Sequence, residues 1–242
     1  MAHASADFSK AMRPISEKEL VHERLGDRFA SALSEYDTLR RIEILVDEFL
    51  GDVKGQRALE VGSGLGFFAR ALQDRGASVV ASDIGEELLR RVKATVGCEC
   101  VRVDALALAD HFGPDSFDIV LSSECIEHTP IPADAVRQMA RVLKPGGRLA
   151  LSTPNLLWYP VVKLATAAGL RPFDGLENFS TFGSLRRTLE EEGLAVLQER
   201  GLHLFPFQAK LFRVSRWCDK NLQILRGLMI NLCVLARKRG RP

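Results

Sequence analysis

The chain has 242 residues, 46% hydrophobic and 26% charged, which is enough to bury one substantial core and argues against wholesale disorder. Lysine and arginine total 33 against 31 for aspartate and glutamate, so the formal net charge of +2 gives no reason to expect a polyanionic partner such as nucleic acid. The five cysteines include no CxxC pair and are odd in number, which argues against a structural zinc site and a disulfide framework.

Residues 1–35 are mostly polar, and their pattern predicts a tail followed by a short helix over Lys18–Leu33. The stretch Met1–Glu19 has no apolar core of signal-peptide length, and the late apolar run Leu228–Ala236 is too short to span a bilayer. With the scattered cysteines, these features predict a cytoplasmic protein without a transmembrane segment.

Apolar residues at helical spacing predict an amphipathic helix over Tyr36–Leu50, ended by Gly51. Short apolar runs then alternate with helical stretches. The predicted strands are Arg57–Val61, Ala77–Ser82, Glu99–Val103, Phe117–Ser122 and Gly147–Ser152, and the helices between them are Phe67–Arg75, Glu86–Thr95 and Ala133–Leu143. This alternation predicts an α/β fold whose parallel sheet is covered on both faces and binds ligands beyond the carboxyl ends of its strands.

The alternation stops after Ser152, which predicts an insertion at about 154–183 within a domain spanning 36–242. Its aromatic residues form either a lid over a flat or lipid-like substrate or ordinary packing against the sheet. A helix over Ser184–Glu192 and strands near Ala195–Leu204 and Met229–Ala236 are predicted to close the fold. We interpret His203 as a core or edge residue, and Leu211–Leu225 as a solvated amphipathic helix or a weak peripheral membrane contact.

The segment Glu60-Val61-Gly62-Ser63-Gly64-Leu65-Gly66 joins a predicted strand to a predicted helix through three glycines. Glycine permits positive φ angles and lets a ligand approach the backbone. Phe67 stands after Gly66, so the spacing departs from the GxGxxG loop of dinucleotide-binding proteins. Asp83 and Asp104 end the next two strands. This acidic edge would repel phosphates but offers acceptors to an ammonium, a ribose diol and an adenine amine.

These residues resemble the motifs of the class I S-adenosylmethionine-dependent methyltransferases, nearest to the ubiquinone-biosynthesis O-methyltransferase-like group. The block Arg141–Leu149 resembles the turn that precedes strand five in this family. The resemblance implies a doubly wound, mainly parallel seven-stranded sheet with a helical N-terminal extension. It also implies that the donor's methionine part contacts Glu60 and the glycine loop, its ribose Asp83, and its adenine Asp104 and Ala105. Ser63, Ile84 and Ser122 complete the expected cofactor site. Glu60 and Ser63 replace the commoner Asp and Cys of the family motif.

The fourth strand runs into Glu124, Glu127 and His128, at the edge where the reacting methyl group is expected. His128 is the candidate general base, because an imidazole titrates near neutral pH. The alternative is that Glu127 and His128 only anchor the loop. The three residues have i, i+3, i+4 spacing, so a helical turn would also offer a site for a divalent metal, as their similarity to ubiquinone-biosynthesis O-methyltransferases implies. Metal-independent relatives share the Glu-His pair.

We therefore expect transfer of a methyl group from S-adenosylmethionine to a small-molecule acceptor, leaving S-adenosylhomocysteine, with a hydroxyl as the acceptor group. The alternatives are N-methylation of an amine or amino sugar, and a non-catalytic binding module that keeps the fold. Nucleic acid is not expected as substrate, since the chain has no Asn-Pro-Pro-Tyr motif and no basic stripe in its central part. The sequence identifies neither the acceptor nor the oligomeric state.

Overall fold

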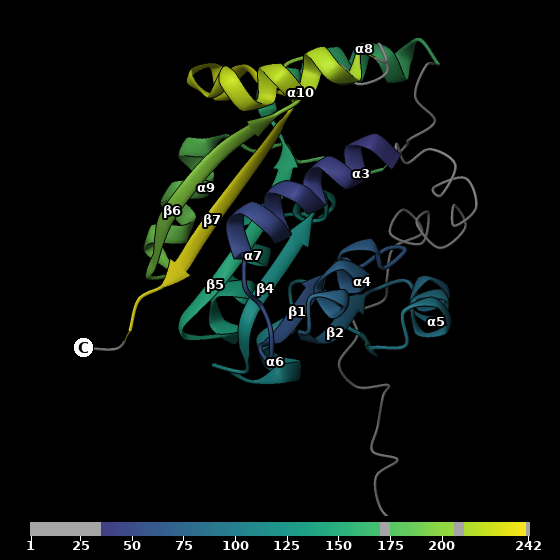
Figure 1. Cartoon of the computed structure of the whole chain (residues 1–242), viewed down its shortest axis with the longest axis vertical. Helices are drawn as coiled ribbons and strands as arrows, with labels where there is room; N and C mark the ends of the chain where they lie inside the picture. The colour runs from purple at the N-terminus through teal and green to yellow at the C-terminus, as the bar shows by residue number, and fades with distance from the viewer. Residues whose placement is uncertain (1–34, 170–174, 206–210, 241–242) are drawn as a thin grey trace, which may run out of the picture.

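The computed structural model describes residues 35–169, 175–205 and 211–240 of the chain. Its strands are β1 (Arg57–Val61), β2 (Ser78–Asp83), β3 (Glu99–Arg102), β4 (Phe117–Ser123), β5 (Leu143–Pro154), β6 (Leu194–Leu202) and β7 (Asn231–Lys238). They form one sheet in the order β3-β2-β1-β4-β5-β7-β6 (Figure 1). The first five strands in this order are parallel, and β7 runs antiparallel to both β5 and β6. This confirms the predicted mainly parallel, seven-stranded sheet.

Helices cover both faces of this sheet. One face carries α3 (Glu35–Ile42), the π-helical η1 (Glu43–Leu50), α4 (Phe67–Asp74) and α5 (Glu86–Thr95), and the other carries α6 (Leu108–Phe112), α7 (Pro132–Val142) and α9 (Phe182–Glu191) (Figure 1). A third group lies beyond the strand ends and consists of η3 (Leu156–Trp158), α8 (Tyr159–Ala167), α10 (Phe212–Asn221) and η5 (Gln223–Leu228). A short turn, η2 (Ile126–His128), follows β4.

Successive residues of the central strands pack on opposite faces. In β4, Ile119 and Leu121 belong to the core under α4 and η1, whereas Phe117 and Val120 belong to the core under α7. All four side chains are fully buried. A strand covered on both faces cannot alternate apolar with polar residues, which is why these strands read as continuous apolar runs. Polar side chains are consequently left to the strand ends.

Three differences from the predictions stand out, while most other element ends shift by no more than two residues. The helix expected over 36–50 is α-helical only to Ile42 and continues as a π-helix. Strand β5 starts at Leu143 rather than Gly147, because Leu143 pairs with Phe117 ahead of an irregularity in the register. The five-residue helix α6 was not predicted, since with one buried residue, Leu108, it is too short to show a helical period. The helix expected over 18–33 lies outside the described residues.

Within the described ranges, no helix combines the length and the apolar composition that a membrane span requires.

Candidate functional site

The glycine loop connects β1 to α4 at the carboxyl edge of the sheet. Gly62, Gly64 and Gly66 all have positive φ angles, of 72°, 51° and 77°. A Cβ atom on Gly62 would lie 2.4 Å from Cys125 Sγ, and one on Gly66 would lie 3.0 Å from the Val92 side chain of α5. Glycine is therefore required twice over, by the backbone conformation and by close contact with neighbouring elements.

Two aspartates hold the adjoining strand ends. The Asp83 carboxylate accepts hydrogen bonds from the backbone N–H groups of Gly64 (2.9 Å) and Gly85 (2.8 Å), which ties the glycine loop to the end of β2. Asp104, after β3, accepts one from Leu106 N–H (2.9 Å). Both carboxylates are only partly buried. The predicted acidic edge is thus formed by neighbouring strands of the sheet.

Glu60, at the centre of this edge, is 2% exposed. Burial raises the pKa of its carboxyl to about 8, against hydrogen bonds from the backbone of Ala69 and Phe68 that lower it. Its Oε2 atom and the Ser63 hydroxyl are buried without any hydrogen-bond partner. Buried polar atoms are almost always satisfied, so two unsatisfied ones beside a glycine loop fit a ligand that brings its own donors, as a methionine ammonium does.

The other three predicted cofactor residues, Ser122, Ile84 and Ala105, lie at or just after the carboxyl ends of β4, β2 and β3. Ser122 is fully buried, and its hydroxyl donates to Val61 O (3.1 Å), which fastens β4 to β1 beneath the loop. Ile84 is partly exposed next to Asp83, and its carbonyl accepts from Arg102 Nε (3.0 Å). Ala105 is 8% exposed beside Asp104.

The segment after β4, where the sequence predicts the reacting edge, does not form the helical turn that the i, i+3, i+4 spacing allowed. Glu124 has a left-handed backbone, with φ 52°, and η2 begins only at Ile126. Glu124 accepts hydrogen bonds from Ser152 Oγ (2.9 Å) and Asn231 Nδ2 (2.8 Å), whereas Glu127 accepts one from Thr153 Oγ1 (3.2 Å). Within the described residues, no three His, Cys, Asp or Glu side chains are placed to hold a metal ion.

Burial controls the charge of these carboxyls. It raises the pKa of Glu124 to about 8, helped by the nearby Glu127, and it raises the pKa of Glu127 to about 7. At neutral pH Glu124 is therefore largely protonated. Burial also raises the pKa of the Cys125 thiol, so this sulfur is not a nucleophile near neutral pH.

His128 projects from the end of η2 with its side chain 25% exposed. Its Nδ1 lies 3.0 Å from the carbonyl oxygen of Leu176. A carbonyl can only accept, so Nδ1 carries the proton and the neutral ring keeps its lone pair on Nε2. That nitrogen lies 3.9 Å from Glu127 Oε1. The ring is held in the tautomer that a base at Nε2 requires.

A buried ionic network supports this edge from behind, and sequence reasoning missed it. Arg41 of α3 donates to Asp37 Oδ2 (2.6 Å) and Ser123 Oγ (3.0 Å), and lies 3.9 Å from Glu124 Oε1. His203, fully buried as expected of a core residue, places its Nε2 2.9 Å from Asp37 Oδ1. The Arg41 guanidinium and this imidazole hold the pKa of Asp37 below its usual range despite burial, which raises it.

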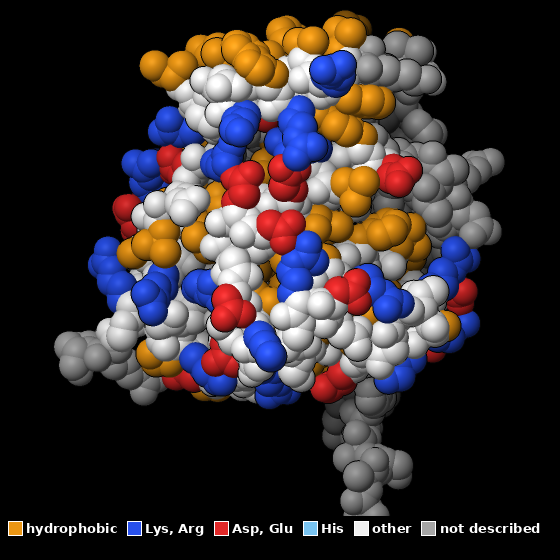
Figure 2. Space-filling model, viewed as in Figure 1, with side chains coloured by type: hydrophobic (Ala, Val, Ile, Leu, Met, Phe, Trp, Pro, Cys, Tyr) orange, Lys and Arg blue, Asp and Glu red, His pale blue; other side chains and the backbone are white. Residues whose placement is uncertain are grey.

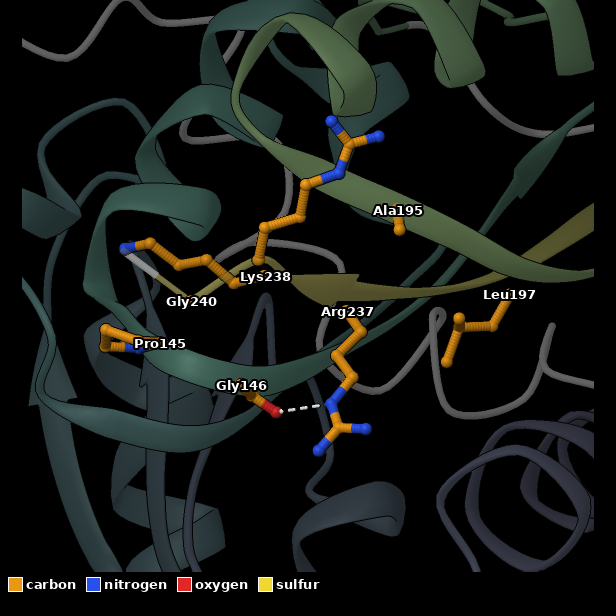
Figure 3. A pocket seen from close by; sticks show the side chains of 8 residues that line it. Pro145, Gly146, Ala195, Leu197, Arg237, Lys238 and Gly240 are labelled. Carbon is orange, nitrogen blue, oxygen red and sulfur yellow. Dashed lines mark hydrogen bonds between the residues drawn. The ribbon is translucent and has the colours of Figure 1, made fainter. Parts of the chain in front are cut away.

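A pocket of about 370 Å³ lies at the opposite edge of the sheet (Figure 3). It is lined by the start of β5, by β6 and by the end of β7, at Pro145, Gly146, Ala195, Leu197, Arg237, Lys238, Arg239 and Gly240. Arg237 Nε donates to Gly146 O (3.0 Å) across it. The residues that line it include no carboxylate, imidazole or thiol, and none of the predicted site residues.

The profile of a family described as "Methyltransferase domain" matches residues 59–151, which contain the glycine loop, both aspartates and the segment after β4. The ubiquinone biosynthesis O-methyltransferase of Neisseria meningitidis serogroup C is 32% identical over 197 residues, covering 74% of this chain and 82% of that protein. The protein of the same name from Pseudomonas fluorescens SBW25 is 34% identical over 218 residues, covering 84% and 92%. The chain belongs to the class I S-adenosylmethionine-dependent methyltransferases.

Solved structures agree with this methyltransferase fold. An S-adenosylmethionine-dependent methyltransferase from Mesorhizobium loti superposes with a TM-score of 0.63 at 23% identity, covering 82% of this chain and 98% of that one. A putative sarcosine dimethylglycine methyltransferase from Galdieria sulphuraria gives 0.65 at 21% identity, covering 88% and 98%. As a member of this family, the methyltransferase uses S-adenosylmethionine as methyl donor.

Replacing Gly62 by alanine is expected to lower the free energy of unfolding by about 3 kcal/mol, because left-handed strain adds to overpacking against Cys125. Urea denaturation measures the change. Gly97→Ala is the matched control: its φ is 80° but nothing lies within 4 Å, so only the strain of about 1 kcal/mol is expected. Equal losses in the two variants would show that the contact with Cys125 has no effect.

Arg41→Met is expected to destabilise the fold by about 3 kcal/mol, because it leaves Asp37 buried without its main cation. The control, Arg90→Met, makes the same substitution in the exposed ion pair with Glu87. There the free energy of unfolding is expected to fall by less than about 1 kcal/mol. A loss at Arg41 as small as at Arg90, measured by urea denaturation, would contradict the importance of the network.

Proposed function

We propose that this methyltransferase methylates a hydroxyl group of a small-molecule acceptor, with His128 as the general base. The observation that carries the proposal is the hydrogen bond from His128 Nδ1 to Leu176 O, which leaves the lone pair of the neutral ring on Nε2 at the reacting edge. The O-methyltransferase names of the relatives from Neisseria and Pseudomonas support a hydroxyl acceptor.

The donor would lie along the carboxyl edge of β1, β2 and β3. Glu60 and Ser63, with their unsatisfied oxygens, would accept hydrogen bonds from the methionine ammonium beside Gly62, Gly64 and Gly66. Asp83 would hold the ribose hydroxyls with Ile84 beside it, and Asp104 with Ala105 the adenine. Ser122 would act indirectly, by fastening the strand beneath the loop.

Bound S-adenosylmethionine supplies an electrophilic methyl group on its sulfonium and remains as S-adenosylhomocysteine after transfer. The protein contributes alignment, since an in-line displacement needs the acceptor oxygen held opposite the sulfur. His128 takes the hydroxyl proton onto Nε2 as the oxygen bonds to the methyl carbon. Glu127, buried and hydrogen-bonded to Thr153, would fix the position of the turn that carries His128. Glu124, held by Ser152 and Asn231, would have the same supporting role.

His128→Ala is expected to lower kcat on phenolic or catechol acceptors by about 100-fold or more, since it removes proton transfer in the transition state. Transfer of labelled methyl from S-adenosylmethionine measures it. Affinity for S-adenosylhomocysteine, measured by calorimetry, should stay within about three-fold of the parent, because the ring belongs to the acceptor side. His111→Ala removes an exposed imidazole from α6; it serves as control and should retain full activity.

Amine acceptors in the same assay test the alternative of N-methylation. An amine that is already neutral attacks without losing a proton first, so its methylation depends less on a base. Turnover of amines but not of hydroxyl compounds, little affected by His128→Ala, would replace the proposal by N-methylation. Folded protein that binds S-adenosylhomocysteine but transfers no methyl group to any acceptor class would point to a binding module.

The Glu60 carboxyl predicts a proton release on cofactor binding. Its pKa of about 8 means that it is mostly protonated at pH 7, and a bound ammonium favours the carboxylate. We expect about half a proton or more to be released per S-adenosylhomocysteine bound at pH 7. Calorimetry in buffers of different ionisation enthalpy counts these protons. Glu60→Gln should bind without the release, and an unchanged release in this variant would place the titrating group elsewhere.

A further inference from the structure

The amino edge of the sheet, where the parallel strands begin, has a second pocket beside the one in Figure 3. Its volume is about 740 Å³, and it is lined by the loop before β1, the start of β4, the turn at the start of β5 and the end of β7. It shares Pro145, Gly146 and Arg237 with the smaller pocket, so the two adjoin. Figure 2, drawn in the view of Figure 1, shows blue Lys and Arg side chains around the end of β7, at the lower left.

The turn at the start of β5 shapes this pocket. The segment 144–147 stands out of the register between β4 and β5. Gly146 in this segment has a φ angle of 81°, and a Cβ atom on Gly147 would lie 2.9 Å from Lys144 O. Side chains are disfavoured at both glycines, so the wall of the pocket next to Arg148 is formed by backbone.

Two arginines stand opposite each other in this pocket. Arg148 of β5 and Arg237 of β7 are directly paired residues of antiparallel strands, and both line the pocket. Such pairs bring their side chains close together on one side of the sheet, and like charges there repel each other. Burial lowers the pKa of Arg148, and the Arg237 guanidinium lowers it further, against Asp52, which raises it. The folded chain therefore retains a repulsion between two guanidinium groups.

Neutral acceptors hold both arginines in place without offsetting their charge. The Arg148 guanidinium donates to three oxygens, which are Leu50 O, Asp52 O (3.0 Å) and Gln56 Oε1 (2.8 Å). Arg237 Nε donates to the carbonyl oxygen of Gly146, and among the described residues the terminal N–H groups of Arg237 have no partner. Neither guanidinium forms an ion pair with a carboxylate in the described ranges of the chain. The pair is thus fixed in position, with donors left for a ligand.

The two carboxylates that line the pocket bind other donors. Asp118 Oδ1 accepts from Lys144 Nζ (2.8 Å), so these two charges cancel. Asp52 is exposed, and its Oδ1 accepts from the Lys54 N–H (3.0 Å). A carboxylate ligand would offset the charge of one arginine only. A phosphate group has about two negative charges at pH 7, and its oxygens accept forked hydrogen bonds from guanidinium groups.

We propose that Arg148 and Arg237 form a binding site for a phosphate group at the amino edge of the sheet. S-adenosylmethionine and S-adenosylhomocysteine contain no phosphate, so the ligand is distinct from the methyl donor and its product. The pocket of about 740 Å³ has room for an organic part beside the phosphate. Arg148 lies at the opposite end of β5 from Ser152, which supports the carboxyl edge, so the site stands apart from the proposed O-methylation.

Thermal unfolding of the full-length protein tests the site without turnover. The probes are ribose 5-phosphate and inorganic phosphate at about 5 mM, compared with sodium chloride of equal ionic strength. Ribose 5-phosphate should raise the Tm by about 3 °C, because a ligand that binds the folded state stabilises it. A smaller shift with inorganic phosphate would identify a phosphorylated metabolite as the ligand, and an equal shift would identify the free ion. Arg237→Gln should weaken binding about ten-fold and reduce either shift to less than about 1 °C.

The matched control removes an arginine from another surface. Arg90→Gln changes an exposed guanidinium of α5 and should keep the full shift of the parent. Both variants should bind S-adenosylhomocysteine like the parent, which shows that they are folded. The absence of any shift beyond that in sodium chloride, or a shift in Arg237→Gln equal to that of the parent, overturns the proposal. Sodium acetate that raises the Tm as much as the phosphates do also overturns it, because the site would then bind carboxylates.

Discussion

The sheet buries both of its faces, and this constraint decides where polar side chains can meet a ligand. Successive strand residues such as Ile119 and Val120 pack into the two cores on opposite faces of the sheet. A polar side chain therefore reaches water and ligands only where a strand ends. Parallel strands end together, which brings Glu60, Asp83 and Asp104 to one edge although about twenty residues separate each from the next. The same edge receives the turn with His128. The order of the strands therefore also determines which candidate site residues lie next to one another.

Charge at this edge is controlled by burial more than by pairing. Glu60, Glu124 and Glu127 all have raised pKa values because they are withdrawn from water. These carboxyl groups therefore carry less negative charge at pH 7 than their number suggests. Such groups make the folded protein less stable as pH rises from about 4.5 toward 8, since the folded state holds protons that the unfolded state loses. Asp37, beside Arg41, has the opposite shift and favours folding at higher pH.

Patterns local in sequence predicted most of the fold and the grouping of Glu60, Asp83 and Asp104 at one edge of the sheet. Strand β1 and helix α5 lie where the apolar period placed them, and the glycine loop follows from turn chemistry that operates within a few residues. The contact of His203 with Asp37 joins positions 166 residues apart, so the spacing of apolar residues along the chain could not predict it. The position of Glu124 was also beyond reach, because its side-chain partners Ser152 and Asn231 come from β5 and β7. For α10, periodicity gave two faces but not which one turns inward.

The inward polar face of α10 has a consequence for how the helix behaves in time. Asp219 and Ser215 are pinned to His203, which in turn contacts Asp37 of α3, so the helix cannot roll about its axis to hide Trp217 without breaking buried hydrogen bonds. The outward display of the tryptophan is then a standing property of the folded chain rather than a response to a partner. A group that met this face would therefore find the tryptophan already exposed, with no preceding rearrangement of the helix.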